Sequence, residues 1–218
     1  LYRNAKLRRI ETTHAADALM QRAGQAAADW AASLAGEQGG AILVLAGPGN
    51  NGGDAFEMAR LLRERFFDIC LVFAGEAAKL PPDAAAARQR YLAEGGSITE
   101  DIPEDRHWSL VVDGLFGIGL ARPPEGRYAG WIGVANRLAE RDACLLLALD
   151  CPSGLDAETG TALAPTIRAS HTLTFIAAKP GLYTADGPDH CGQIRIADLA
   201  LDATAEAEPD GRIISRHD

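Results

Sequence analysis

The stretch Ala41-Ile-Leu-Val-Leu-Ala-Gly-Pro-Gly-Asn-Asn-Gly-Gly-Asp54 decides the fold class of this chain. Its first six residues form a continuous apolar run between glycines, which is typical of a parallel strand buried on both faces. A glycine-rich loop over 47–53 follows, and apolar residues within 55–65 then recur with helical spacing. A strand, a glycine loop and a helix in this order predict a βαβ unit.

The same alternation of strands and helices continues through the rest of the chain. We predict further strands over 69–74, 110–112, 144–149, 172–177 and 193–196, and helices over 83–94 and 128–141. Before the first strand, residues 5–35 carry a helical pattern that ends naturally at Gly36. Strands that alternate with helices predict an α/β fold, with a parallel sheet covered by helices on both faces.

Composition and charge restrict the class of protein. The 218 residues, 47% of them hydrophobic, suffice for one domain with its own core. The 21 basic and 30 acidic residues give a net charge of −9, which argues against nucleic-acid binding as the main role. No apolar run approaches the roughly 18 residues that a membrane span needs. Four cysteines without a CxxC pair predict reduced thiols, and therefore a cytoplasmic protein.

Polar and glycine-rich clusters follow four of the predicted strands. They are Gly47-Pro-Gly-Asn-Asn-Gly-Gly-Asp54, Asp113-Gly-Leu-Phe-Gly-Ile-Gly-Leu-Ala-Arg122, Asp150-Cys-Pro-Ser-Gly-Leu-Asp156 and Lys179-Pro-Gly181. In an open parallel sheet, ligands bind outside the carboxyl ends of the strands, where these loops converge. The sequence therefore predicts one site at one edge of the sheet.

The first cluster contains G-x-G-x-x-G between a strand and a helix, as in a dinucleotide-binding Rossmann unit, with Glu76 available as the ribose-binding acid. Asp54, however, lies where the helix would meet a pyrophosphate, and its charge opposes that attraction. The loop is not a P-loop, because no Gly-Lys-Ser/Thr follows. Asp54 either lies beside a reacting group or only caps the helix.

Asp113 and Asp150 each end an apolar strand, where a charge is costly unless it is paired. Two carboxylates that face one cleft favour acid–base chemistry, or they share a cation; the alternative for each is a turn-forming role. Ser153 is not part of a G-x-S-x-G nucleophile motif, so a metal or ligand contact is the better interpretation.

Two cations accompany these carboxylates. Lys179 is either a solvated turn residue or a cation for phosphate or the carboxylates, and Arg122 is a candidate counter-charge for an anionic ligand. The five histidines have no metal-binding spacing, so we interpret them as structural or surface groups.

Taken in order, these motifs resemble the YjeF N-terminal domain family, the NAD(P)H-hydrate epimerases. Leu19-Met-Gln-Arg-Ala-Gly24, Thr159-Gly160 and the four clusters carry the resemblance, which spans about residues 5–200. It implies a Rossmann-like three-layer α/β/α sandwich with a mostly parallel central sheet. It also implies that the protein interconverts the S and R epimers of hydrated NADH or NADPH, a damaged form of the cofactor.

The resemblance also assigns site residues. It implies that the hydrated dinucleotide contacts Asn50, Asn51, Gly52, Gly53, Asp54, Gly117, Ile118, Gly119, Leu120, Ala121, Arg122, Pro123 and Asp150, and we count Lys179 with them. It implies a potassium ion held by Asn51, Asp113 and Ser153. The family often has Ala, Thr and Gly where this chain has Gly114, Ile118 and Ala55. Ile118 lacks the hydroxyl, so that contact comes from the backbone or is missing.

The chemistry of the substrate suits these residues. The hydroxyl to be lost is on a carbon next to a ring nitrogen, so its departure leaves an iminium-like cation. An acid must protonate the hydroxyl and anions must stabilise the cation; our hypothesis assigns this to Asp150, with Asp113 as its partner. The alternatives are an NAD(P)-dependent oxidoreductase and a non-catalytic dinucleotide-binding module.

The organisation of the chain follows from the same resemblance. We expect the epimerase domain over residues 1–201, and a tail or the start of an interdomain linker over 202–218, which is polar and lacks apolar periodicity. The resemblance suggests a homodimer and, as partner, a fused or separate ATP- or ADP-dependent dehydratase that consumes the S epimer. From the net charge, and because no apolar run has the length of a membrane span, we expect no nucleic-acid or membrane partner.

Overall fold

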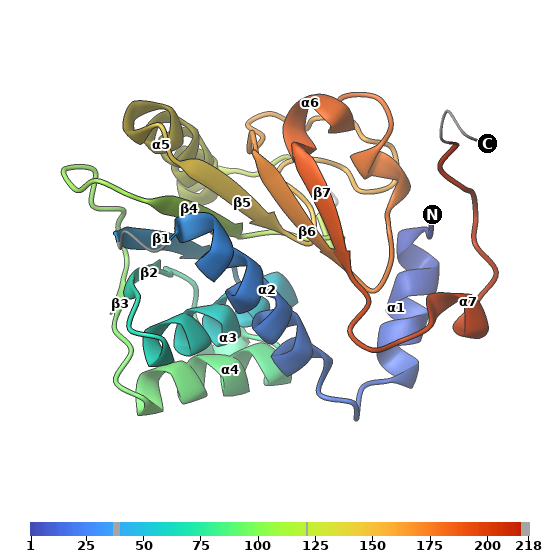
Figure 1. Cartoon of the computed structure of the whole chain (residues 1–218), viewed down its shortest axis with the longest axis horizontal. Helices are drawn as coiled ribbons and strands as arrows, with labels where there is room; N and C mark the ends of the chain where they lie inside the picture. Colours follow the sequence, from blue (N-terminus) through green and yellow to red (C-terminus); the bar gives the residue numbers. More distant parts are fainter. Residues whose placement is uncertain (37–39, 121, 215–218) are drawn as a thin grey trace.

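The computed structural model describes residues 1–36, 40–120 and 122–214, and it contains a seven-stranded sheet in the order β3-β2-β1-β4-β5-β6-β7 (Figure 1). Every neighbouring pair of these strands is parallel. The strands are β1 (Ala41–Ala46), β2 (Asp68–Val72), β3 (Ile98–Thr99), β4 (Leu110–Gly114), β5 (Leu145–Leu149), β6 (His171–Phe175) and β7 (Gln193–Ala197). The predicted α/β class is confirmed, and this order is that of doubly wound sheets.

Helices cover both faces of the sheet (Figure 1). They are α1 (Asn4–Thr13), α2 (Leu19–Ala35), α3 (Asn50–Glu64), α4 (Pro82–Ala93), α5 (Gly126–Asp142), α6 (Gly187–Cys191) and α7 (Ala203–Glu206), with short 3-10 turns at Ala77–Lys79 and Pro180–Leu182. Helices α2, α3 and α4 pack together on one face, and α5 covers the other. The arrangement is a three-layer α/β/α sandwich.

The two core layers explain why β1 is apolar at every position. Ile42 and Val44 belong to the core under α2 and α3, whereas Leu43 and Leu45 belong to the core under α5. Since successive side chains of a strand point to opposite faces, a strand buried on both sides needs an unbroken apolar run.

The register of the strands brings the predicted clusters to one edge. Leu45 of β1 is paired with Asp113 of β4, and Asp113 is paired with Ala148 of β5. The residues that follow β1, β4, β5 and β6 therefore emerge side by side, and hydrogen bonds between these loops, described below, confirm that they meet.

Two predicted elements near this edge differ from the structure by more than two residues. The helical pattern over 5–35 is two helices, α1 and α2, separated by a turn in which Ala18 has a left-handed backbone (φ 53°). The His14 ring holds the turn by hydrogen bonds to Asp17 (2.6 Å) and to Glu206 of α7 (2.9 Å). Because Glu206 is 192 residues from His14 in the sequence, a local sequence pattern cannot predict this contact.

Helix α3 begins at Asn50, five residues before the predicted start. The Gly52-Gly53 pair, unfavourable for a helix by propensity, lies inside its first turn because tertiary packing overrides propensity there. Asp54 is therefore inside α3, and Gly49 is the residue that precedes the helix. The capping interpretation of Asp54 is wrong.

The segment after β7 packs against the N-terminal residues of the chain. Asp210 accepts hydrogen bonds from the Lys6 ammonium (2.8 Å) and the Arg3 N–H (2.9 Å), and the Asp210 N–H donates to the Leu1 carbonyl (2.9 Å). These contacts hold α1 in place. Among the described residues, no helix combines the length and apolar character needed to cross a membrane.

Candidate functional site

The glycine loop after β1 packs against the backbone after β4. The Gly47 N–H donates to the Gly114 carbonyl (2.9 Å). A Cβ on Gly47 would overlap the Leu115 carbonyl oxygen, and one on Gly52 would overlap the Gly47 carbonyl oxygen. A Cβ on Gly49 would meet nothing within 4 Å. The loop is thus closed on its inner side and open at Gly49, where a ligand can approach the backbone.

The two asparagines after this loop have different surroundings. Asn50 is exposed, whereas the Asn51 side chain is 7% exposed. Neither polar atom of the Asn51 amide has a hydrogen-bond partner among the described residues. A Cβ on Gly114 would lie 3.3 Å from the main-chain carbonyl oxygen of Asn51, so the Asn51 backbone lies against the last residue of β4. A buried amide without a partner is costly, which points to a ligand at this position.

Asp113 and Ser153 form a buried polar pair. Asp113 is 0% exposed and accepts hydrogen bonds from the Ser153 hydroxyl (2.7 Å) and N–H (2.8 Å) and the Leu115 N–H (3.2 Å). Burial raises the pKa of the Asp113 carboxyl to about 6, and the bonds from Ser153 and Leu115 oppose that shift. Asp113 ties the loops after β4 and β5 together.

Asp150 is paired with a buried lysine. The Lys179 ammonium lies 2.6 Å from Asp150 Oδ1, and it also donates to Thr174 Oγ1 (2.6 Å) and the Phe175 carbonyl (2.9 Å). Lys179 is 1% exposed, so the alternative of a solvated turn lysine is wrong. Asp150 has a left-handed backbone (φ 65°), a strained conformation that is common at functional sites.

The loop after β4 reaches Asp150 through its backbone. The Ile118 N–H donates to Asp150 Oδ2 (2.8 Å), and Gly117 leaves room for this carboxylate, which a Cβ would overlap. The Leu120 N–H closes a turn onto the Gly117 carbonyl (3.1 Å). The Ile118 backbone therefore holds Asp150, and whether Ile118 contacts the ligand stays a prediction.

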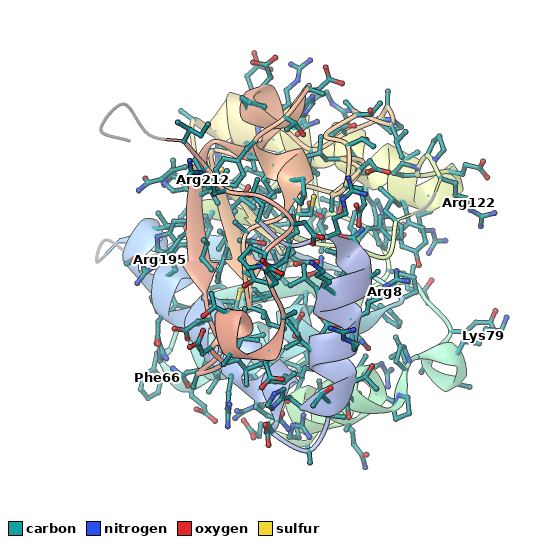
Figure 2. The ribbon with its side chains drawn as sticks, turned by 90° about the vertical axis from the view of Figure 1, so that its right-hand side faces the viewer. Arg8, Phe66, Lys79, Arg122, Arg195 and Arg212 are labelled. Carbon is teal, nitrogen blue, oxygen red and sulfur yellow. The ribbon has the colours of Figure 1, made fainter. Side chains whose placement is uncertain are left out.

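The rest of that loop lies at the surface. Gly119, Arg122 and Pro123 are exposed, and Figure 2 shows Arg122 projecting from the loop into solvent. Ala121 lies outside the described residues. The structure thus joins Gly117, Ile118, Asp150 and Lys179 by direct contacts, and Arg122 is not in contact with them.

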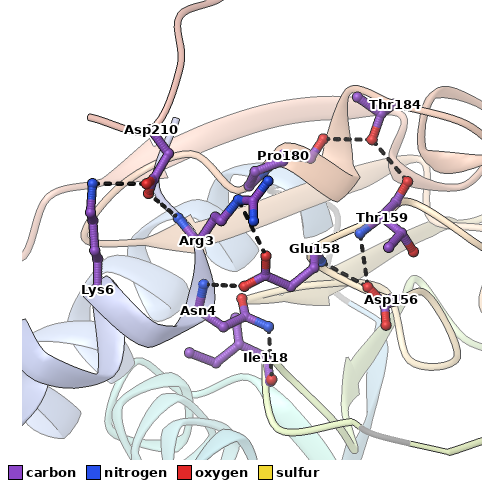
Figure 3. Close-up of polar contacts among 10 residues, drawn as sticks. All are labelled: Arg3, Asn4, Lys6, Ile118, Asp156, Glu158, Thr159, Pro180, Thr184 and Asp210. Atoms are coloured by element: carbon purple, nitrogen blue, oxygen red, sulfur yellow. Dashed lines mark hydrogen bonds and ion pairs between the residues drawn. The ribbon is translucent and has the colours of Figure 1, made fainter.

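Helix α1 also belongs to this edge, which the sequence pattern did not indicate. The Asn4 amide donates to the Ile118 carbonyl (3.3 Å), and the Asn4 N–H donates to Glu158 Oε1 (2.5 Å) (Figure 3). Arg8 lies 3.5 Å from the same Ile118 carbonyl. Polar residues on an amphipathic helix are normally solvated, so nothing in the local pattern distinguished these from surface residues.

A cavity of about 560 Å³ opens between α1, α2, α3 and the end of β6. Its walls are polar and apolar in nearly equal measure, and its polar groups include Glu11 and Thr12 from α1 and Asn50 and Asp54 from α3. Burial, and then the charges of Asp150 and Glu11, raise the pKa of the Asp54 carboxyl well above its usual range. A cavity of this size with few convergent polar groups is typical of a small-molecule site.

These features define a class of protein. A doubly wound parallel sheet, with an open glycine loop before a helix and paired charges at the carboxyl edge, is a Rossmann-like nucleotide-binding α/β domain. Residues 16–181 match the family model described as "YjeF-related protein N-terminus". The chain belongs to this family.

Curated relatives agree with this assignment. The chain is 42% identical over 198 residues to a Bordetella bronchiseptica protein named NAD(P)H-hydrate epimerase, a match that covers 89% of this chain and 84% of that protein. It is 39% identical to a Leishmania major bifunctional NAD(P)H-hydrate repair enzyme, covering 84% of this chain and 33% of that one. The Escherichia coli bifunctional NAD(P)H-hydrate repair enzyme Nnr is 40% identical, covering 74% and 31%.

A solved structure agrees with the fold. The crystal structure of the yeast protein ynu0 superposes with a TM-score of 0.66 at 18% identity, covering 91% of this chain and 86% of that one. At this identity the likeness concerns the fold alone.

Proposed function

We propose that this protein is an NAD(P)H-hydrate epimerase, which interconverts the R and S epimers of hydrated NADH and NADPH. One observation carries the proposal beyond family membership: the Asp150–Lys179 pair, buried at the carboxyl edge beside an open glycine loop. A charged carboxylate at this position suits a reaction that passes through a cation on the substrate ring.

The proposed reaction breaks and remakes one bond of the substrate. The ring carbon loses its hydroxyl as water, and the electron pair of the neighbouring nitrogen forms an iminium-like cation. Asp150, held by Lys179 and by the Ile118 N–H, stabilises this cation until water adds to either face. Asp113 is fully buried with both oxygens engaged, so we assign it to holding the loops and a cation.

The remaining residues of the site are proposed to bind the dinucleotide. The open side of Gly49 and the free N–H groups at the start of α3 suit ribose and phosphate oxygens. We retain the assignment of substrate binding to residues 50–54 and 117–123 as a proposal.

Potassium fits the group formed by Asn51, Asp113 and Ser153. The set offers carboxylate, amide and hydroxyl oxygens, which suit a hard monovalent cation, and the unpartnered Asn51 amide supports the assignment. When bound, the ion would supply positive charge that orders the loops after β1, β4 and β5.

Replacement of Asn51 by alanine is expected to abolish a selective effect of potassium. In wild type, potassium should raise the melting temperature above that in equal sodium, because an ion that binds only the folded state stabilises it. In Asn51→Ala this difference should vanish, and the potassium concentration for half-maximal activity should rise by roughly tenfold or more. Equal melting temperatures and rates of the wild type in both salts would contradict the potassium site.

The activity itself is tested by incubating R-epimer NADPH hydrate with the protein in potassium buffer. Proton NMR or chromatography should show the S epimer forming well above the rate without protein. An oxidoreductase would instead consume intact NADPH with a suitable acceptor, and a binding module would bind the hydrate without turnover. Either result would replace the proposed function.

We also propose a cellular compartment and partners for this protein. The four cysteines are free thiols, which supports a reducing compartment such as the cytoplasm. We propose a dehydratase, fused or separate, as the enzyme that uses the S epimer, and we retain residues 202–218 as the region that leads towards it. A homodimer is proposed from the family resemblance, and light scattering of the purified protein tests it.

A further inference from the structure

The cavity beside α1 provides two carboxyl groups that the proposed reaction has not yet used. Glu11 and Asp54 both line it, from α1 and α3 respectively. The opposite walls are apolar and come from α2 and from the end of β6, including Met20, Phe175 and Ile176. A flat ring can lie against such walls with its polar substituents towards the carboxyl groups.

Contacts at the two ends of α1 hold Glu11 at this position. The Asn4 amide fixes the start of α1 to the Ile118 carbonyl, and the His14 ring fixes its end to Asp17 and Glu206. Because the Ile118 N–H also donates to Asp150, α1 and the Asp150–Lys179 pair are joined through the backbone of one residue, Ile118. Glu11 precedes the matched family segment, which begins at residue 16.

The charges around Glu11 favour its neutral form. Burial and then the negative charge of Asp150 raise the pKa of the Glu11 carboxyl, whereas Lys179 and Arg8 lower it.

Asp54 is affected in the same way by its neighbours. Burial, Asp150, Glu11 and then Glu57 on α3 raise the pKa of the Asp54 carboxyl, and Lys179 opposes them. Asp83 of α4, at the exposed rim of the cavity, adds a further negative charge. Carboxyl groups that share a site disfavour one another's ionisation, so the raised pKa of Asp54 suits a group that donates a proton.

We propose that Asp54 is the catalytic acid of the epimerisation and that Glu11 is the residue that positions its proton, an inference that rests on the proposed function. The Asp54 carboxyl gives its proton to the departing hydroxyl, the C–O bond breaks, and water leaves. The electron pair of the ring nitrogen forms the C=N bond of the cation, which faces Asp150. Water then adds to the opposite face and loses its extra proton to solvent, and the Asp54 carboxylate takes up a proton from solvent, so no oxidant or reductant is consumed.

The variants Asp54→Asn, Glu11→Gln and Glu11→Asp test this division of roles. The matched control is Glu64→Gln, an exposed carboxyl on the same helix as Asp54. Rates of R-to-S conversion are measured from pH 5 to 9 after subtraction of the rate without protein, together with incorporation of ¹⁸O from labelled water, which reports C–O cleavage directly. Melting temperatures identify any variant that fails to fold.

Asp54→Asn should lose about 10²-fold or more in kcat for both conversion and ¹⁸O incorporation, with KM changed far less. Glu11→Gln should lose roughly tenfold, because the negative charge that helps to keep the Asp54 carboxyl protonated is removed. Removing the negative charge of Glu11 lowers the pKa of Asp54, so the acid loses its proton at lower pH and the basic limb moves to lower pH. Glu11→Asp should restore most of the activity, and Glu64→Gln should match the wild type.

The outcomes separate the two proposals. If the wild type does not convert the hydrate, the proposed function fails. If the wild type converts it and Asp54→Asn does so at the same rate, the assignment of Asp54 fails alone. If Glu11→Gln lowers the rate equally at every pH, or not at all, the role of Glu11 is overturned while that of Asp54 stands.

Discussion

Replacing Asp150 by asparagine is expected to slow epimerisation by about 10²–10⁴-fold, the range typical of groups that act directly in the transition state. Asparagine keeps the size of the side chain and can still accept the hydrogen bond from the Ile118 N–H. It removes the negative charge that faces the cation on the substrate ring. The rate of R-to-S conversion checks this, and a loss smaller than about tenfold would reduce Asp150 to a binding role.

The same substitution should also destabilise the fold. Lys179 is 1% exposed, so removing its carboxylate partner leaves a buried ammonium without a counter-charge, a change that typically costs about 3–5 kcal/mol. The bonds from Lys179 to Thr174 and Phe175 remain and place the expected cost near the lower value.

A double variant separates the two effects of this substitution. Asp150→Asn combined with Lys179→Met removes the buried charge together with its partner, so much of the lost stability should return. The rate should stay low, because the anion is still missing. Recovery of the rate together with the melting temperature would show that Asp150 acts through folding alone.

The strands and the shared edge of the sheet were predictable because their causes are local. A continuous apolar run such as 41–46 can be buried on both faces only in a central parallel strand. Parallel strands then place the residues that follow them at one edge, whatever the details of packing. Asp113, Asp150 and Lys179 were therefore located from the sequence by their position after a strand.

The partners of these residues were not predictable, because they depend on contacts between distant segments. From the sequence alone, Lys179 was either a solvent-exposed turn residue or a cation of the site. Its burial against Asp150 excludes the solvent-exposed alternative. Glu11 lies within the helical pattern predicted over 5–35, and nothing in that pattern singles it out. It faces the cavity because the turn at His14, held by Glu206, directs α1 across the carboxyl edge.

Replacing Gly47 by alanine is expected to lower the free energy of unfolding by about 3 kcal/mol or more, the upper end for an overpacked site. The added Cβ would overlap the Leu115 carbonyl oxygen, which is backbone and cannot turn aside like a side chain. Either the glycine loop or the end of β4 must move, and the hydrogen bond from Gly47 to Gly114 would be strained. For a domain of this size the loss corresponds to a melting temperature lower by about 6–12 °C.

Gly49→Ala is the matched control, two residues along the same loop. Its backbone is extended (φ −116°) and its Cβ would meet nothing within 4 Å, so stability should change by no more than about 0.5 kcal/mol. If the open side of Gly49 receives the phosphates of the dinucleotide, this variant should raise KM while the melting temperature stays constant. Equal melting temperatures for Gly47→Ala and Gly49→Ala would contradict the close packing of the loop, and an unchanged KM in Gly49→Ala would place the phosphates elsewhere.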